Sequence, residues 1–318
     1  MMPCCTRSRS VEALMLNGTE VSLEQLLQLQ QPARRDHTRS FAHLVGLRES
    51  RLAGSGLQMR ELRAYQPGDD LRHLHWRATA RLGEPLTRVF EQENELTWLL
   101  VLALTPGMYF GSRSAYKSVR AIEAAAALGW SRHDAGDAVG SLILSPHGVE
   151  VLRPARTRQR WLAQLDAWAR HSRLVYKPAL GHQQFVEFQT ELQRLAVPGR
   201  PLVIFGDLLP PHDWGGCLQT LARSPVTLVQ LQDPLEADVP ASGQYPVSGQ
   251  DGTFLIQGSR RTRERYQAAR DAWFANLSSQ VDRLRCQWVR LSTLDDPAHW
   301  QWQEGRPQEP AASSTREL

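Results

Sequence analysis

The chain after residue 96 carries two alternating patterns of apolar residues. Short, continuous apolar runs predict strands that are covered on both faces of a sheet. Segments with apolar residues at every third or fourth position predict helices between them. The predicted strands are 97–104, 138–145, 148–154, 201–207, 225–233 and 286–291, and the predicted helices are 114–133, 158–170, 185–195, 212–223 and 263–285. Strands that alternate with helices predict an α/β fold with a mostly parallel sheet flanked by helices.

The residues before 96 carry a weaker pattern. Leucines at helical spacing predict a short helix at 21–31, and a polar, arginine-containing linker follows it. Partial alternation predicts strands at 54–65 and 84–93, and therefore a small β-rich N-terminal extension. The predicted division is a helix and linker at 1–40, the extension at 41–95, the α/β domain at 96–292 and a partly disordered tail at 293–318.

The composition is that of a globular protein with a small positive charge. Hydrophobic residues make up 42% of the chain, which supports a packed core, and the formal net charge is +4. Of the 37 basic residues 35 are arginine, and the two lysines are Lys117 and Lys177. The four cysteines show no metal-ligand spacing and no disulfide framework, which fits a reducing compartment.

The sequence also bears on localisation. The most apolar run, 96–104, has nine residues, which is about half of what a membrane-spanning helix needs. The N-terminus lacks the apolar core of a signal peptide, and Met1, Met2 and Met15 are alternative start residues. We therefore expect a cytoplasmic protein that does not insert into a membrane.

The densest polar stretch of the chain begins at Arg63. Asp69 and Asp70 lie in a turn that Pro67 and Gly68 favour. The neighbouring arginines are Arg63, Arg72, Arg77 and Arg81. We interpret the two carboxylates as turn caps and as ion-pair partners of these arginines. The ion pairs would attach the extension to the α/β domain or shape a docking face. Acid–base catalysis is the alternative, but it needs two carboxyl groups in different environments within a cleft, and the sequence indicates no cleft.

Other candidate groups point to structural roles. His73 and His75 would share one side of a strand, but two ligands do not make a metal site. Cys217 follows His212 by five residues and is expected to be a buried helical cysteine, not a nucleophile. The chain has no phosphate-binding glycine loop, and its basic residues are not interleaved with exposed aromatic residues. We therefore expect neither ATPase activity nor nucleic-acid binding.

The stretch SGLQMRELRAYQPGDDLRHLHWRATARLGEPLTRVFEQE resembles the signature of the Domain of Unknown Function 58 family. The matching positions are Arg63, Tyr65, Pro67, Gly68, Asp69, Asp70, Arg72, Trp76 and Arg81. The resemblance continues through IFGD and LQDPLEADVP and covers roughly residues 40 to 292. One position departs from the family pattern: His75 stands where the family usually has an acid.

The resemblance implies a von Willebrand factor A-like, Rossmann-like domain with a family-specific extension. Such families are usually encoded near MoxR-type AAA+ ATPases. The resemblance therefore implies a non-enzymatic adaptor that binds proteins and works with such an ATPase.

Von Willebrand factor A domains often carry a metal-ion-dependent adhesion site with an Asp-x-Ser-x-Ser run after the first strand. Aligned on Met108, Ala103 here replaces the aspartate and Gly107 the second serine, while Thr105 and Asp207 keep one hydroxyl and one carboxylate. Divalent magnesium needs more oxygen ligands than these. We therefore expect a vestigial site and no cofactor. The alternative is a magnesium-dependent binding domain or hydrolase that uses Asp207 and the Asp69/Asp70 pair.

Overall fold

The computed structural model describes residues 18–30, 53–66, 74–91, 96–173, 180–210, 212–237, 242–249 and 252–295. The chain divides into two compact units. The smaller unit consists of residues 47–96, and the larger unit consists of residues 1–46 and 97–318. Each unit is described by itself below.

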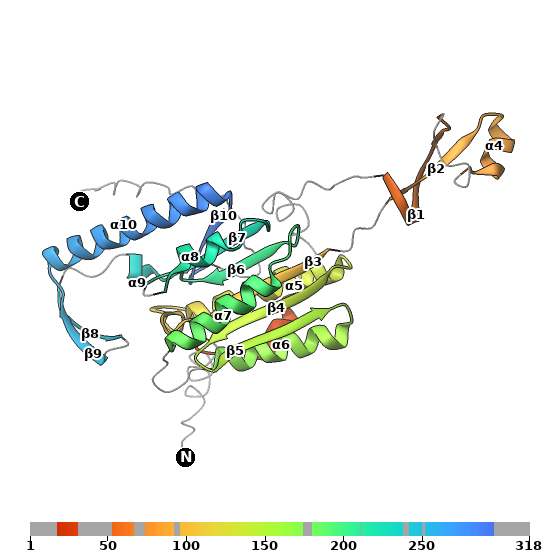
Figure 1. Ribbon diagram of the computed structural model, residues 1–318. Helices are drawn as coiled ribbons and strands as arrows, with labels where there is room; N and C mark the ends of the chain where they lie inside the picture. Colours follow the sequence, from red (N-terminus) through yellow and green to blue (C-terminus); the bar gives the residue numbers. More distant parts are fainter. Residues whose placement is uncertain are drawn as a thin grey trace, which may run out of the picture. The chain divides into compact units, whose positions relative to one another are not determined.

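The larger unit is built on a six-stranded sheet with the strand order β10-β7-β6-β3-β4-β5 (Figure 1). Its strands are β3 (Thr97–Ala103), β4 (Ala138–Ser145), β5 (Gly148–Ala155), β6 (Leu202–Gly206), β7 (Val226–Gln232) and β10 (Gln287–Ser292). All neighbours pair in parallel except β4 and β5, which form an antiparallel hairpin at the edge. This confirms the predicted mostly parallel sheet flanked by helices.

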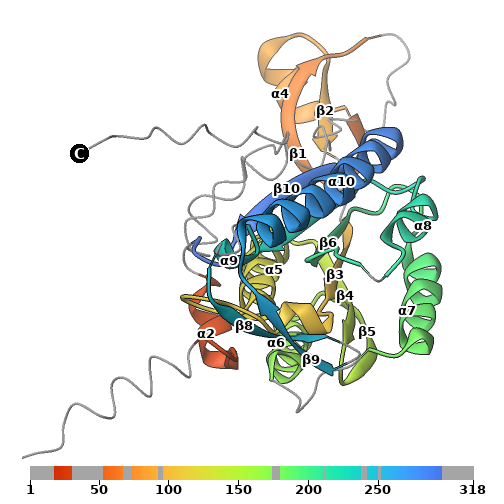
Figure 2. The ribbon, with the colours of Figure 1, turned by 90° about the vertical axis from the view of Figure 1, so that its left-hand side faces the viewer.

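Helices cover both faces of this sheet (Figures 1 and 2). One face carries α5 (Lys117–Asp134) and α6 (Arg158–Ser172), and α2 (Leu23–Gln28) packs against these two helices. The other face carries α7 (His182–Leu195), α8 (Trp214–Gln219) and α10 (Arg260–Leu284), whose apolar side chains join those of β3, β4, β6 and β7 in one core cluster. Burial on both faces explains why the strand sequences are almost continuously apolar.

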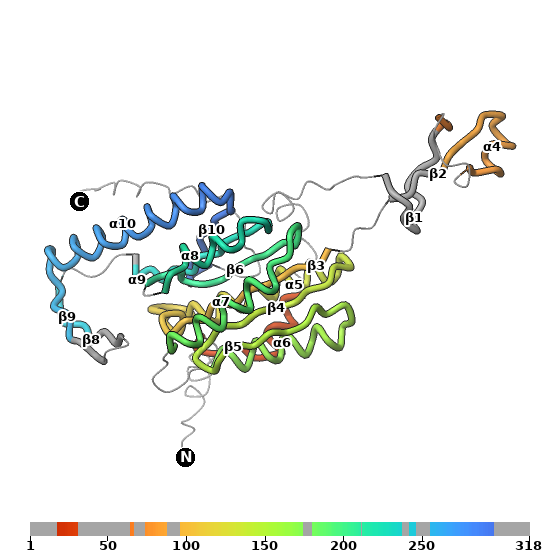
Figure 3. The backbone as a smooth tube through the Cα atoms, in the orientation of Figure 1, coloured from red at the N-terminus to blue at the C-terminus, as the bar shows by residue number. Residues whose placement is uncertain are grey.

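The remaining elements of the larger unit are short. They are the 3-10 turn η2 (Pro106–Met108), α9 (Pro234–Ala237), β8 (Gln244–Gly249) and β9 (Gly252–Gln257). The sequence 243–257, with the turn-forming pair Asp251-Gly252, predicts a hairpin. Strands β8 and β9 pair antiparallel, which confirms it. After β9 the chain runs through α10 and returns to the sheet as β10 beside β7 (Figure 3).

The smaller unit contains the antiparallel strands β1 (Ala53–Ala64) and β2 (Leu86–Glu91), as the sequence predicts. Between them lies a helix that was not predicted, α4 (Trp76–Leu82). His75 is its N-cap, and its Nδ1 accepts a hydrogen bond from the backbone N–H of Ala78 at 3.1 Å. His75 therefore caps a helix and does not share a strand face with His73, which lies outside the described residues.

Candidate functional site

A group of buried polar and charged side chains lies where β3 and β6 end. These neighbouring parallel strands continue in opposite directions, since β3 leads to α5 on one face of the sheet and β6 leads to α8 on the other. In an open α/β sheet the carboxyl ends of such a strand pair form the crevice where ligands usually bind. Thr105 follows β3 and Asp207 follows β6, so the sequence places one hydroxyl and one carboxylate at this point.

The structure brings Thr105 and Asp207 together. The Thr105 hydroxyl donates to both carboxylate oxygens of Asp207, at 3.2 and 3.3 Å. Gly107 lies against the same carboxylate, and a Cβ added there would be 2.8 Å from Asp207 Oδ2. Ala103 is the last residue of β3 and is fully buried, but it supplies no ligand oxygen. All four residues expected to form the vestigial site thus lie at the end of β3 or of β6.

The cation at this site is an amino acid side chain. Lys117, the first residue of α5, is fully buried, and its Nζ lies 3.3 Å from Asp207 Oδ2 and 2.6 Å from Glu236 Oε1. Burial lowers the pKa of this ammonium group, but the Asp207 and Glu236 carboxylates raise it more, and its pKa is above the ordinary value. Lys117 is therefore charged, and its ammonium group lies between the carboxylates of Asp207 and Glu236.

Glu236 of α9 is the second carboxylate that contacts Lys117. Its Oε1 pairs with Lys117, and its Oε2 accepts a hydrogen bond from the backbone N–H of Asp233 at 3.1 Å. The Tyr266 hydroxyl of α10 donates to the backbone carbonyl of Glu236 at 2.9 Å. Both oxygens of this carboxylate are therefore used within the chain.

Asp233, which follows β7, connects the start of α9 to two other segments of the chain. Its carboxylate accepts hydrogen bonds from the Ser112 N–H at 2.9 Å, the Thr293 hydroxyl at 2.8 Å and the Leu235 N–H at 2.9 Å. Burial raises the pKa of Asp233, but these hydrogen bonds lower it more, and the pKa is below its ordinary value. The carboxylate is therefore ionised and fixes the position of α9, which carries Glu236.

The backbone after Asp207 turns sharply. Leu208 has a φ of 54°, in the left-handed region that non-glycine residues rarely adopt. Its carbonyl accepts a hydrogen bond from the Trp273 indole at 3.1 Å, and the next carbonyl, of Leu209, accepts one from the Trp214 indole at 3.3 Å. The two tryptophans therefore stabilise an unfavourable backbone conformation directly beside the site.

The cavity at this site is small. A cavity of about 20 Å³ lies beside Asp207, Glu236 and Tyr266, and it has space for about one water molecule. Among the described residues, no group of three or more histidines, cysteines, aspartates or glutamates is arranged to hold a metal ion. The carboxylates of Asp207 and Glu236 are instead engaged by Lys117 and by hydrogen bonds within the chain.

The signature residues of the smaller unit are only partly described. Tyr65, Trp76 and Arg81 lie in it, and Trp76 is 69% exposed at the start of α4. Outside the described residues lie the positions Pro67, Gly68, Asp69, Asp70 and Arg72, together with the side chain of Arg63. The ion pairs expected of Asp69 and Asp70 therefore stay a prediction.

Cys217 is a buried residue of α8, as expected. Burial, with a smaller effect from Asp213, raises the pKa of its thiol to about 12, so the thiolate nucleophile is not formed near neutral pH. His212 stacks on Phe185 with ring centroids 4.5 Å apart. Burial lowers the pKa of His212, against the opposing effect of Asp207.

Sequence reasoning missed Lys117, Glu236 and Asp233 as members of one site. Lys117 is one of two lysines in an arginine-rich chain, and this is the one signal that singled it out. Glu236 and Lys117 are 119 positions apart, and no local pattern links them.

The fold and the site define an α/β protein in which a buried lysine pairs with two carboxylates near the carboxyl ends of the parallel strands. The chain belongs to the family described as "Protein of unknown function DUF58", whose sequence profile matches residues 61–273. This confirms the resemblance seen in the sequence. Among the helices of the described part of the chain, none is long and apolar enough to cross a membrane.

Curated relatives of the chain include uncharacterised proteins of Mycobacterium bovis and Mycobacterium tuberculosis. Each is 31% identical to this chain over 195 residues, which is 60% of this chain and 60% of the relative. The chain therefore matches less than two thirds of the length of these relatives.

Solved structures with some likeness include a conserved hypothetical protein, BatB, from Bacteroides thetaiotaomicron. It is 11% identical, with 62% of this chain and 90% of that chain covered and a TM-score of 0.38. An aerotolerance-related membrane protein from Bacteroides fragilis is 10% identical, with 64% and 93% covered and a TM-score of 0.36. Likenesses this distant carry no functional argument.

Proposed function

We propose that this chain is a non-enzymatic adaptor that binds other proteins and works with a MoxR-type AAA+ ATPase in the cytoplasm. In this proposal the larger unit is a von Willebrand factor A-like domain whose metal-ion-dependent adhesion site is degenerate. The strand order supports this reading. Numbered along the chain, the six strands run 3-2-1-4-5-6 across the sheet, and Thr105 and Asp207 follow strands 1 and 4 at the point where the order reverses.

The observation that carries the proposal is the position of Lys117. A divalent ion in such a crevice would need several oxygen ligands. Here a buried ammonium group stands between Asp207 and Glu236, and Glu236 supplies the outer carboxylate from the chain itself. The single positive charge of Lys117 also neutralises only one of the two negative charges of Asp207 and Glu236. The site therefore works as an internal support, and the chain binds partners through its surface.

The helix α4 of the smaller unit is the surface we propose for docking. It belongs to the signature block, and its first and last residues, Trp76 and Leu82, are 69% and 70% exposed. Large exposed apolar side chains on a short helix are typical of protein-binding sites, and tryptophan is enriched among residues that dominate binding. Arg77 and Arg81 of the same helix are exposed and add charged groups for an acidic partner face.

Co-purification tests the proposal. The full chain is immobilised and exposed to a MoxR-type ATPase from the same organism, with and without ATP. We expect specific retention, and we expect Trp76→Ala to weaken it at least about tenfold, as substitution of a central aromatic anchor does. Leu255→Ala, which truncates a 65% exposed leucine of β9, is the matched control and should bind as the unchanged chain does. Failure of the unchanged chain to retain the ATPase in either condition would overturn the proposed partner.

The alternative function is a magnesium-dependent binding domain or hydrolase that uses Asp207 and the Asp69/Asp70 pair. The ammonium group of Lys117 beside Asp207 speaks against it, because a divalent ion at that place would be repelled. Calorimetric titration with magnesium and manganese separates the two functions. We expect no binding in the millimolar range, whereas binding that is lost in Asp207→Asn would support the alternative.

A further inference from the structure

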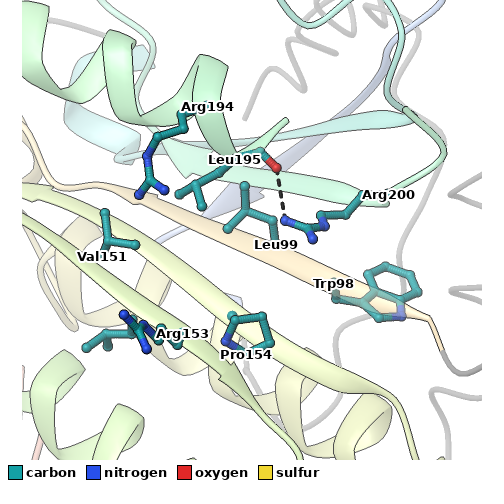
Figure 4. Close-up of a pocket in the computed structure, with 10 residues that line it drawn as sticks. Trp98, Leu99, Val151, Arg153, Pro154, Arg194, Leu195 and Arg200 are labelled. Carbon is teal, nitrogen blue, oxygen red and sulfur yellow. Dashed lines mark hydrogen bonds between the residues drawn. The ribbon is translucent and has the colours of Figure 1, made fainter. Parts of the chain in front are cut away.

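A second concave site lies at the amino ends of β3 and β4, the opposite end of the sheet from Lys117. It has a volume of about 270 Å³ and lies between β5, the end of α7 and the segment before β6 (Figure 4). Leu144 and Leu142 of β4 point into the core beneath α7. Gly140 is the next residue in this row and has no side chain, so the row of leucines stops there. Pro154 packs against Gly140, since a Cβ added there would be 3.1 Å from Pro154 Cγ, and both residues line the hollow.

A β-bulge shapes the same hollow. Val139 pairs with Ala155 and Ser141 pairs with Leu152, so two residues of β5, Arg153 and Pro154, lie opposite Gly140. Bulges of this kind redirect a side chain at the edge of a sheet. Here Arg153 and Pro154 both line the hollow.

The walls combine an apolar base with arginines. Leu99, Val151 and Leu195 supply the apolar surface. Arg153 of β5 and Arg194 of α7 come from elements on either side of it, and Arg200 comes from the segment before β6 (Figure 4). None of the described residues that line the hollow is acidic. It is therefore an apolar site whose rim carries three arginines.

The three guanidinium groups differ in what they already bind. Arg200 donates to the Leu195 carbonyl at 3.0 Å, which fixes the loop. Arg194 is bonded twice to Glu191, at 3.0 and 2.6 Å, on the exposed side of α7. Arg153 is exposed at the rim. A carboxylate that enters the site can therefore bind Arg153 and can compete with Glu191 for Arg194.

We propose that this hollow binds an acidic peptide segment of a partner protein, with one or two apolar side chains inside it and flanking carboxylates on Arg153 and Arg194. The volume is slightly below the range of about 300–1,000 Å³ that is common for small-molecule sites, and it suits side chains better than a whole cofactor. Planar guanidinium groups match carboxylates with two parallel hydrogen bonds, which gives the acidic preference. The site is separate from α4 and does not depend on the ATPase proposed above.

Fluorescence polarisation with labelled peptides tests the proposal on the full chain. The probe peptide is EELLEE, and the controls are KKLLKK and EESSEE. We expect only EELLEE to bind, with an affinity that falls as salt is added. The double variant Arg153→Ala/Arg194→Ala should weaken binding at least about tenfold, since two charge-assisted contacts are lost. Both side chains are exposed, so the fold should tolerate the change.

Two further variants keep the test specific. Glu191→Gln frees Arg194 and should tighten binding, whereas a merely basic surface would respond little to the loss of one acid. Arg160→Ala removes an exposed arginine of α6 outside the hollow and should leave binding unchanged. Equal binding of EELLEE and EESSEE, or equal loss in Arg160→Ala and the double variant, would overturn the proposal. Binding to phosphatidylglycerol vesicles without binding to EELLEE would also overturn it.

Discussion

Replacing Lys117 by methionine tests whether its ammonium group holds the site together. Methionine has a similar length and fills a similar space, so the main change is the loss of one buried charge. The side chain of Asp207 is 4% exposed and that of Glu236 is 22% exposed, so two carboxylates would be left without their cation. Removing one partner of a buried ion pair typically costs about 3–5 kcal/mol. Glu236 can turn partly to water, so we expect a loss of about 3 kcal/mol, at the lower end of this range.

Urea unfolding, followed by tryptophan fluorescence, measures this loss. The informative set is the unchanged chain, Lys117→Met, Asp207→Asn and the double variant, which together form a double-mutant cycle. We expect the double variant to lose less than the sum of the single changes by at least about 1 kcal/mol, because the neutral amide introduced by Asp207→Asn no longer needs the cation. A loss below about 0.5 kcal/mol in Lys117→Met, or strictly additive effects, would refute the reasoning, since such values are ordinary for surface substitutions.

Three further predictions concern neighbouring groups. The His171 ring accepts a hydrogen bond from the Ser145 hydroxyl and donates one to Glu150, both at 2.7 Å, and burial lowers its pKa below 6.5. The stability that neutral His171 contributes is therefore present above pH 6.5 and is lost as the pH falls through the lowered pKa. Urea unfolding at about pH 7.5 and about pH 5 should show that His171→Gln loses less stability on acidification than the unchanged chain does. Gly107→Ala places a Cβ 2.8 Å from the Asp207 carboxylate and should destabilise the chain by about 1–3 kcal/mol in the same assay. Gly136→Ala is the control: Gly136 has a φ of 91° and its added Cβ would meet nothing within 4 Å, so this variant measures the cost of backbone strain alone. Cys217, buried and with a pKa of about 12, should react with iodoacetamide only after unfolding; labelling in the native state would show that α8 opens.

Much of the fold could be predicted from the sequence, because buried parallel strands leave continuous apolar runs. The runs at 97–104 and 201–207 correspond to β3 and β6, and the Asp-Gly turn predicts the β8–β9 hairpin. Helix α4 could not be predicted in the same way. It has seven residues, none of its side chains is buried, and it therefore shows no apolar periodicity.

The site was predicted in part for a similar reason. Thr105 and Asp207 each follow an apolar run, so their place at the carboxyl edge of the sheet can be inferred from the sequence. In the sequence Lys117 looks like an ordinary polar residue at the start of a helix. Its burial depends on Asp207, which follows β6, and on Glu236 of α9, and both are distant from it in the sequence. In retrospect its chemistry explains its identity. A compact ammonium group lies 2.6 and 3.3 Å from the two carboxylates, and the guanidinium of arginine, the usual basic residue of this chain, is broader.

Anomalous diffraction from a crystal of the protein soaked in manganese chloride tests the central claim most directly. If the ammonium group of Lys117 takes the place of a metal ion, no manganese peak should appear within coordination distance of Asp207, and Lys117 Nζ should stay between Asp207 and Glu236. A well-occupied manganese ion bound to Thr105 and Asp207, with Lys117 displaced, would contradict it.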